Sequence, residues 1–379
     1  MLGPRVARAG AGTGAGPGGV PRTAAEAAAA VDAVLAEHLH ARVAEARSVD
    51  AVFADEVATR VAEFVLRGGK RLRTAFVWCG WLAAGGTGDP GTPLRVGAAL
   101  ELLQACALVH DDVMDESPVR RGAPAVHADF ARTHREGRMR GSAASYSATA
   151  AVLTGDLALA WADDLLTETA LASPYGDRLF REWQAMRGEM VAGQYLDMRA
   201  QATGSSDPAL ARTIATLKSA YYTVARPLAL GACLTGASAG ALDGLRSAGR
   251  CAGLAFQLRD DLLGAFGDPA VTGKPTDEDL RSRKLTFLLA AALRLAAETG
   301  DTEALAVLGP EGSGADTVDR MRAALERTGA RAAVEEEITE LSAASLRHFA
   351  DTGADPRARR EFAALVARAV GAVPNGEGA

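Results

Sequence analysis

Two runs of aspartates stand at the ends of apolar helical stretches, and they carry the clearest chemical signal in the sequence. They are Asp111, Asp112 and Asp115 in HDDVMD, and Asp260 and Asp261 in QLRDD. Residues four apart share one helix face, so Asp111 and Asp115 stand side by side. Carboxylates at the end of a mostly buried helix oppose its dipole and repel one another, so positive charge must neutralise them. Mg²⁺ fits, because it takes one or two protein carboxylates and fills its remaining positions with water and phosphate oxygens.

An acidic cluster on a helix is more often a solvated surface, and this alternative has to be weighed. The pair Asp163-Asp164 in WADDLL has no basic loop after it, and we predict that it lies on an exposed helix face. The first aspartate run is followed by Arg120 and Arg121, whose guanidinium groups suit a phosphate clamp. Two aspartate-bearing helix ends that face one cavity would form a site for several metal ions.

A second charged stretch, RGGKRLR, predicts an anion site at the start of a helix. Gly68-Gly69 allows the backbone to approach a ligand closely, and a helix N-terminus attracts anions. Lys70, Arg71 and Arg73 add positive charge in a chain whose net charge is -6.

Lysine is rare in this chain. Of 41 basic residues only four are lysine, namely Lys70, Lys218, Lys274 and Lys284. A chain biased so strongly towards arginine keeps lysine where a compact ammonium is needed, and an ammonium binds phosphate well. The alternative is coincidence in an arginine-rich coding sequence.

Composition excludes several classes of function. The net charge of -6 argues against nucleic-acid binding, which needs a basic surface. The four cysteines contain no CxxC pair, so neither a zinc site nor a disulfide framework is indicated and a cytoplasmic location is expected. No uninterrupted apolar run is long enough to predict a transmembrane span. Residues 1–22 and 372–379 are expected to form disordered tails.

Between these tails the pattern predicts one all-α domain over residues 23–371. Aromatic residues are only 5% of the chain, and no sustained alternation typical of strands occurs. Ligand sites in helical bundles are built from side chains of facing helices. The expected helices cover about 24–47, 50–66, 70–84, 94–116, 141–170, 176–200, 208–236, 239–264, 278–298, 316–328, 331–349 and 355–371.

The order of these motifs resembles that of the trans-isoprenyl diphosphate synthases. The resemblance covers roughly residues 50 to 290 and rests on GGKRLR, HDDVMD, RRG, Gly155-Asp156, Gly193-Gln194, Lys218, FQLRDD, and GKP with Lys284. It implies an isoprenoid-synthase-type helical bundle with a central apolar cavity, and usually a homodimer. The cavity is expected to hold an allylic diphosphate, isopentenyl diphosphate and Mg²⁺.

The resemblance also implies roles for individual residues. Asp111, Asp115 and Asp260 are the expected metal ligands, supported by Asp112 and Asp261, with Lys218 also in the catalytic centre. The expected contacts of the allylic diphosphate are Arg120, Lys218, Gln257 and Lys274. Those of isopentenyl diphosphate are Lys70, Arg73, Gln104 and Arg121.

Two positions depart from the family pattern. Thr74 stands where the first basic motif usually ends in proline, which removes a rigid helix start but no charged contact. Gly264 stands at the fifth position of the second aspartate motif, so its last carboxylate is missing. Asp268 is the next aspartate, and whether it takes part in metal binding stays open.

The implied reaction is head-to-tail condensation of isopentenyl diphosphate with an allylic diphosphate. The small residues Cys106 and Ala107, with Leu103 as a deeper floor, predict mainly geranylgeranyl diphosphate; Leu153 is a further candidate for the wall. A farnesyl or C25 product is the alternative. A class I terpene cyclase would need no second diphosphate site, and a non-catalytic partner subunit would have lost an aspartate motif.

Overall fold

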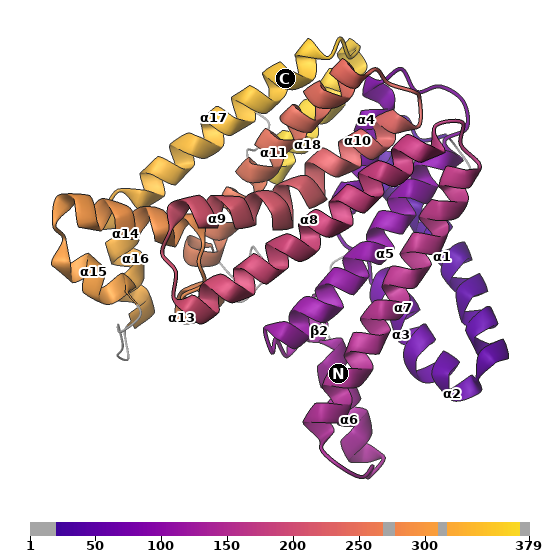
Figure 1. Ribbon diagram of the computed structural model, residues 1–379, viewed down its shortest axis with the longest axis horizontal. Helices are drawn as coiled ribbons and strands as arrows, with labels where there is room; N and C mark the ends of the chain where they lie inside the picture. Colours follow the sequence, from indigo (N-terminus) through magenta and orange to yellow (C-terminus); the bar gives the residue numbers. More distant parts are fainter. Residues whose placement is uncertain (1–19, 268–276, 310–316, 372–379) are drawn as a thin grey trace, which may run out of the picture.

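The computed structural model describes residues 20–267, 277–309 and 317–371, and these are built almost entirely of helices (Figure 1). The predicted all-α class is therefore confirmed. Most of the two expected tails lies outside the described residues.

The N-terminal half supplies one wall of the bundle. Its elements are α1 (Ala24–Val49), α2 (Ala51–Phe53), the π-helical η1 (Ala54–Ala58), α3 (Thr59–Leu66), α4 (Leu72–Ala83), α5 (Gly91–Met114), β1 (Val119–Arg120), β2 (Ala123–Pro124), α6 (Val126–Glu136) and α7 (Ala143–Leu171).

The second half supplies the opposite wall and a helical extension, which lies at the left of Figure 1. Its elements are α8 (Gly176–Thr203), α9 (Pro208–Ile214), the π-helical η2 (Ala215–Ala225), α10 (Arg226–Cys233), α11 (Ala239–Phe266), α13 (Glu278–Arg281), α14 (Phe287–Thr299), α15 (Thr302–Leu308), α16 (Thr317–Arg327), α17 (Ala330–Asp351) and α18 (Pro356–Ala369).

The structure differs from the expected elements in four places. The short helices α6 and α15 were not predicted, because each offers only two or three apolar residues to the core. The helix expected over 278–298 is divided into α13 and α14, since Thr286 caps α14 by accepting a hydrogen bond from Leu289 N at 3.1 Å. A two-residue β-hairpin, β1-β2, follows α5 where no strand was expected.

The hydrophobic core has two large clusters, and α11 contributes to both. The first packs α11 against the N-terminal helices, and the second packs the last turns of α11 against α14–α17. Since α11 carries the second aspartate run, its position is set by apolar packing from both sides.

Helix α5 lies in the middle of the bundle. By length and composition it could cross a membrane, but 72% of its most apolar window is buried inside the protein. Such burial is typical of a core helix, because neighbouring helices already cover the apolar surface. The first aspartate run therefore stands at the end of a helix held by close packing.

Helices α4 and α10 touch backbone to backbone. A Cβ atom at Gly80 would lie 2.0 Å from the carbonyl oxygen of Leu228, well inside van der Waals contact. No residue with a side chain fits there unless the two helices move apart.

We expect Gly80→Ala to destabilise the protein by about 1–3 kcal/mol, because the added methyl group forces α4 from α10. Gly240→Ala is the matched control: Gly240 lies in α11, and no atom lies within 4 Å of the position that an added methyl group would take there. The control should be neutral or stabilising by up to about 1 kcal/mol. Urea unfolding followed by circular dichroism measures both, and equal stabilities would contradict the close-packing argument.

Candidate active site

The first aspartate run lies at the C-terminal end of α5. Asp111 is partly buried, Asp112 is fully buried, and Asp115 forms the C-cap and is exposed. Positive charge is present there, as the helix dipole requires. The Asp111 carboxylate is 3.2 Å from Nζ of Lys218 and 3.7 Å from a guanidinium nitrogen of Arg120.

The β1-β2 hairpin folds the arginines back over the end of α5. Its two turn residues, Arg121 and Gly122, both have positive φ angles (54° and 73°), as hairpins with two-residue turns require. Arg120 Nε donates to Asp112 Oδ1 at 2.7 Å. Asp112 therefore orients Arg120, and Arg120 lies within reach of Asp111.

Lys218 reaches α5 from the π-helical segment η2. This segment packs closely on α8, since a Cβ atom at Gly193 would lie 2.6 Å from the backbone nitrogen of Lys218. Stretches of π-helix are rare and are frequently found at functional sites. Here the ammonium of Lys218 is placed between Asp111 and Asp197, 2.9 Å from the latter.

Asp197 and Lys284 are site residues that the assignment of roles from sequence missed. Asp197 on α8 is buried and also lies 3.6 Å from Nζ of Lys284. Burial alone would raise the pKa of Asp197, but Lys284 and Lys218 outweigh it and hold that pKa below its usual value. Both could have been identified as candidates from the sequence, because Asp197 lies one helical turn after Gly193-Gln194 and Lys284 is one of the rare lysines.

The second aspartate run lies near the end of α11. Asp261 is buried and its Oδ1 accepts a hydrogen bond from Gln257 at 2.7 Å; Gln257 in turn accepts one from Ser219 of η2 at 2.5 Å. Asp260 is partly exposed. Gln257 therefore supports Asp261 in the structure and links α11 to the segment that carries Lys218.

Three of these aspartates have pKa values above the usual value. Burial, then the neighbouring Asp111, raises the pKa of Asp115. Burial also raises the pKa of Asp112, against the effect of Arg120. The pKa of Asp261 is raised to about 7, first by burial and then by Asp260 among other carboxylates. Carboxylates crowded in this way favour a bound cation, because it relieves both burial and repulsion.

A separate cluster of positive charge lies beside the start of α4. Arg73 stacks on the ring of Tyr222 at 4.1 Å and donates to Thr223, while Arg121 packs against Gly69 and donates to the carbonyl oxygen of Gly68. Lys70 is exposed beside them. Burial, then Arg71 and other arginines, lowers the pKa of Arg121. Crowded guanidinium groups of this kind favour an anion.

The expected contribution of Arg71 to anion binding is not supported by its geometry. Arg71 is buried and turned inward, where it pairs with Glu101 at 3.1 Å and with Asp32 at 2.8 Å. Both partners are on neighbouring helices, so this side chain fastens the loop before α4 to α1 and α5. Its charge is already balanced by two carboxylates.

The residues expected to bind substrate along α5 differ in burial. Gln104 and Ala107 are partly exposed on the same side of the helix as Asp111, and no hydrogen-bond partner of Gln104 Oε1 is found among the described residues. Cys106 and Leu103 are buried, with Cys106 Sγ 3.7 Å from Nδ1 of His110. Leu153 on α7 is 57% exposed, which does not suggest a floor formed within one chain.

The pair Asp163-Asp164 was expected on an exposed helix face, and the structure confirms this for only one of the two. Asp163 is not on an exposed face, because its carboxylate accepts hydrogen bonds from Trp183 Nε1 at 2.7 Å and from Arg187 across the α7–α8 contact. Asp164 is exposed as expected. Lys274 and Asp268 lie outside the described residues.

The donor set suits Mg²⁺, which prefers carboxylate oxygens and keeps several positions for water and substrate. Asp112 Oδ2 and Asp197 Oδ1 are buried without a hydrogen-bond partner among the described residues, so unused acceptors stand at the site. Within the described ranges, no group of three or more His, Cys, Asp or Glu side chains is placed to hold a metal ion by itself.

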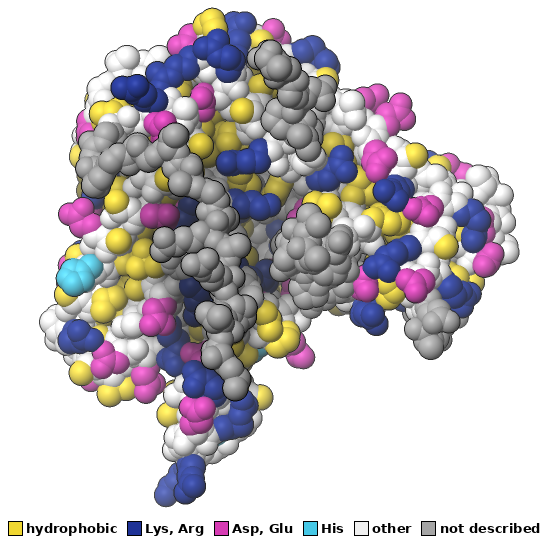
Figure 2. Space-filling model, turned by 180° about the vertical axis from the view of Figure 1, so that it is seen from behind, with side chains coloured by type: hydrophobic (Ala, Val, Ile, Leu, Met, Phe, Trp, Pro, Cys, Tyr) yellow, Lys and Arg dark blue, Asp and Glu magenta, His cyan; other side chains and the backbone are white. Residues whose placement is uncertain are grey.

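From the back, Figure 2 shows Lys and Arg side chains gathered towards the centre of the molecule, where the surface is hollowed above hydrophobic side chains. A hollow lined with positive charge attracts anionic substrates. Acidic helix ends, basic side chains and an apolar interior are the parts needed to bind a diphosphate with an apolar tail.

Comparison with known proteins agrees with this arrangement. The sequence model of the Polyprenyl synthetase family matches residues 55–326. The chain belongs to this family. Its resemblance to trans-isoprenyl diphosphate synthases is thereby confirmed.

The similar polyprenyl synthetases are named for different products. The chain is 34% identical to a geranylgeranyl diphosphate synthase of Mycobacterium tuberculosis over 69% of each chain. It is 30% identical to a geranylfarnesyl diphosphate synthase of Aeropyrum pernix, over 65% of this chain and 72% of that one. It is also 35% identical to a (2E,6E)-farnesyl diphosphate synthase of Mycobacterium bovis, over 58% of this chain and 55% of that one.

The fold is shared with solved structures of this enzyme class. A geranylgeranyl pyrophosphate synthase from Corynebacterium glutamicum, solved with isoprenyl diphosphate and magnesium, superposes with a TM-score of 0.86 at 36% identity. The superposition covers 92% of this chain and 99% of that chain. The predicted isoprenoid-synthase-type bundle is therefore confirmed.

We expect the buried Asp261 to make stability depend on pH in the absence of metal. Its pKa rises from the usual 3.8 to about 7 on folding, so the native state binds a proton more tightly than the unfolded chain. Stability should therefore fall as pH rises from about 4 to about 7, by up to about 4 kcal/mol from this group. In Asp261→Asn, urea unfolding in EDTA at pH 5 and pH 8 should show a smaller fall than in wild type. An equal fall in both proteins would contradict the assignment.

Proposed function

We propose that this polyprenyl synthetase condenses isopentenyl diphosphate head to tail with an allylic diphosphate, in a Mg²⁺-dependent reaction that gives mainly geranylgeranyl diphosphate. The observation that supports this most is that one ammonium group, that of Lys284, lies among aspartates of both runs. Lys218 contacts Asp111, and Asp197 lies between Lys218 and Lys284. The charge of Lys284 interacts with Asp115 and Asp111 of the first run and with Asp261 of the second.

The chain's own residues bind and orient the allylic diphosphate. Arg120 and Lys218 lie beside Asp111, where they are placed to contact the phosphate oxygens, and Lys274 is proposed as a further contact. Bound Mg²⁺ would supply positive charge that stabilises the diphosphate as it leaves. Asp111, Asp115 and Asp260 are the proposed ligands. Gln257 holds the carboxylate of Asp261 by a hydrogen bond at 2.7 Å.

Isopentenyl diphosphate is assigned to the basic cluster at Lys70, Arg73 and Arg121, with Gln104 facing it from α5. Breaking the allylic C–O bond leaves a carbocation, which the double bond of isopentenyl diphosphate attacks. The proton then lost from carbon passes to an oxygen of the departing diphosphate, and no side-chain nucleophile is required. The apolar helices exclude water, which would otherwise convert the cation to an alcohol.

The separate basic cluster favours this reaction over that of a class I terpene cyclase. A cyclase ionises one prenyl diphosphate and has no use for a second anion site. Here Arg73 is held by contact with Tyr222, and Arg121 by contacts with Gly68-Gly69. Five aspartates in two runs also argue against a non-catalytic partner subunit.

The product length is proposed from α5. Ala107 lies one turn before Asp111 on the partly exposed side of the helix and is small. A chain growing along this side would pass Ala107 and extend towards Leu103, with Cys106 at the edge. This leaves room for a C20 product, with C15 and C25 products as the alternatives.

We further propose that the enzyme works as a homodimer. Val191, Tyr195 and Met198 form an exposed apolar stripe on α8, with exposed fractions of 62%, 62% and 46%. Leu153 on α7 is also exposed. Apolar residues at this spacing suit an isologous contact with a second copy of the chain.

We expect purified protein to extend allylic diphosphates with isopentenyl diphosphate only when a divalent cation is present. Asp111→Ala should lower kcat by about two to three orders of magnitude, because charge stabilisation in the transition state is lost. The exposed Asp164→Ala is the control and should leave turnover unchanged. Chromatography of the dephosphorylated products measures turnover, and turnover that persists in EDTA would refute the proposal.

We expect Ala107→Phe to shift the main product from geranylgeranyl towards farnesyl diphosphate, because the ring blocks the path beside Asp111. Leu103→Ala should lengthen the product, since it removes bulk two turns before the aspartate run. Product alcohols from each allylic starter are compared by chromatography with those of the wild type. An unchanged product in Ala107→Phe that still turns over would show that the chain grows elsewhere.

A further inference from the structure

The second aspartate run lacks a carboxylate at its fifth position, Gly264, but a carboxylate from elsewhere in the chain lies there. A Cβ atom built on Gly264 would lie 3.1 Å from Oδ2 of Asp279. Asp279 belongs to α13, beyond the end of α11. Its carboxylate therefore stands where the side chain of a residue at position 264 would begin.

The start of α13 is fastened to the end of α11 by hydrogen bonds. The backbone nitrogen of Asp277 donates to the carbonyl oxygen of Gly264 at 3.2 Å. Arg322 on α16 donates to the carbonyl oxygen of Ala265 at 2.7 Å and also to the carboxylate of Asp277. These contacts with α11 and α16 hold the start of α13, and with it Asp279, beside Gly264.

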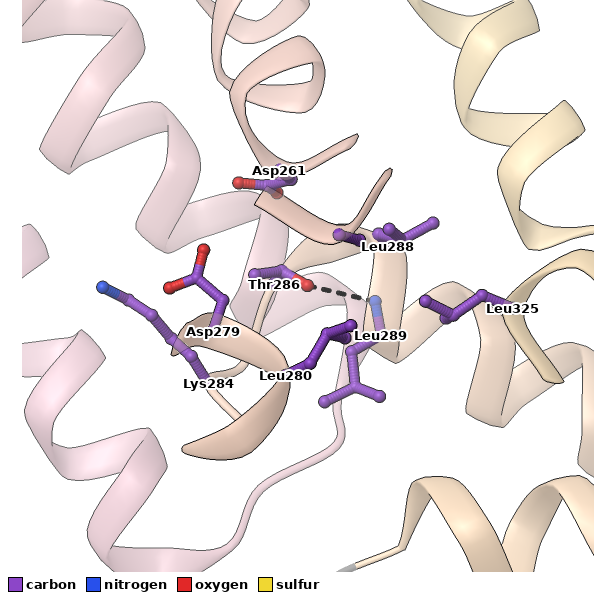
Figure 3. Close-up of a pocket in the computed structure, with 9 residues that line it drawn as sticks. Asp261, Asp279, Leu280, Lys284, Thr286, Leu288, Leu289 and Leu325 are labelled. Carbon is purple, nitrogen blue, oxygen red and sulfur yellow. Dashed lines mark hydrogen bonds between the residues drawn. The ribbon is translucent and has the colours of Figure 1, made fainter. Parts of the chain in front are cut away.

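The Asp279 carboxylate faces the site. Figure 3 shows it directed towards Asp261, with the ammonium group of Lys284 beside it. All three residues line one pocket together with Thr286. Lys284 also faces Asp197, 3.6 Å away on α8. Asp279 is thus part of the charged arrangement that joins the two aspartate runs.

We propose that Asp279 supplies, from α13, the carboxylate that Gly264 leaves out of the second aspartate run. It acts as a positioning residue, whose negative charge joins those of Asp260 and Asp261 in attracting the divalent cation and keeps Lys284 in place. This inference rests on the proposed metal-dependent function of the site.

The inference is tested by moving the carboxylate from one segment to the other. The variants are Asp279→Asn, Asp279→Ala, Gly264→Asp and the double variant Gly264→Asp with Asp279→Ala. The control is Asp164→Asn on the exposed face of α7. Each protein is titrated with Mg²⁺ at fixed inorganic pyrophosphate, and the rise of Tm above the metal-free Tm of the same variant is measured.

We expect Asp279→Asn and Asp279→Ala to raise the Mg²⁺ concentration at half-maximal stabilisation about 10- to 100-fold, as loss of a supporting carboxylate does. The double variant should recover most of this loss, whereas Gly264→Asp alone should lower the metal-free Tm by crowding two carboxylates. The control should titrate like the wild type.

An Mg²⁺ midpoint unchanged in Asp279→Asn would overturn the proposal, and so would a double variant no better than Asp279→Ala. A wild type that shows no Mg²⁺-dependent stabilisation would also overturn it. The readout needs no turnover, so a protein that binds Mg²⁺ and pyrophosphate but makes no prenyl product would contradict the proposed function alone.

Discussion

Charge balance at the C-terminal end of α5 is the constraint on which the rest of the site depends. Asp111 and Asp115 stand where the helix dipole is unfavourable to them, and Asp112 is buried beside them. Two elements bring positive charge to these carboxylates: η2 places Lys218 beside Asp111, and the β1-β2 hairpin places Arg120 beside Asp112. Both contacts depend on how the surrounding helices pack.

The basic cluster at the start of α4 is distinct from the basic residues that contact the first aspartate run. Carboxylates with raised pKa values lie at the ends of α5 and α11, where Lys218 contacts Asp111 and Arg120 contacts Asp112. The pKa of Arg121 is lowered first by burial and then by Arg71 and other arginines. An arginine whose charge is balanced by two carboxylates within the protein contributes little to binding an anion. Arg71 shows the difference, because its pairing with Glu101 and Asp32 removes it from ligand binding and makes it a fastener of the loop.

The helical class and most helix positions could be predicted, because they depend on local composition and period. The errors share a cause. Helices α6 and α15 are short and have few apolar residues, so their periodic signal is weak. The division between α13 and α14 depends on the cap at Thr286 and on contacts of α13 with α11 and α16, and only the cap is visible in sequence. The paired aspartates Asp163 and Asp164 look alike in sequence, yet only Asp163 is held by Trp183 and Arg187 on another helix.

By itself the sequence determined the chemistry that this protein has available: carboxylates at two helix ends, a basic glycine loop and rare lysines, in an order that identifies the family. Only the tertiary structure decided which of these groups meet. It placed Lys218 between Asp111 and Asp197, turned Arg71 inward, and set Asp279 against Gly264. The physical reason is that helix period and caps are local properties. Contacts between charges on different helices depend instead on how closely the helices pack and where each one ends, and these are set by the whole core.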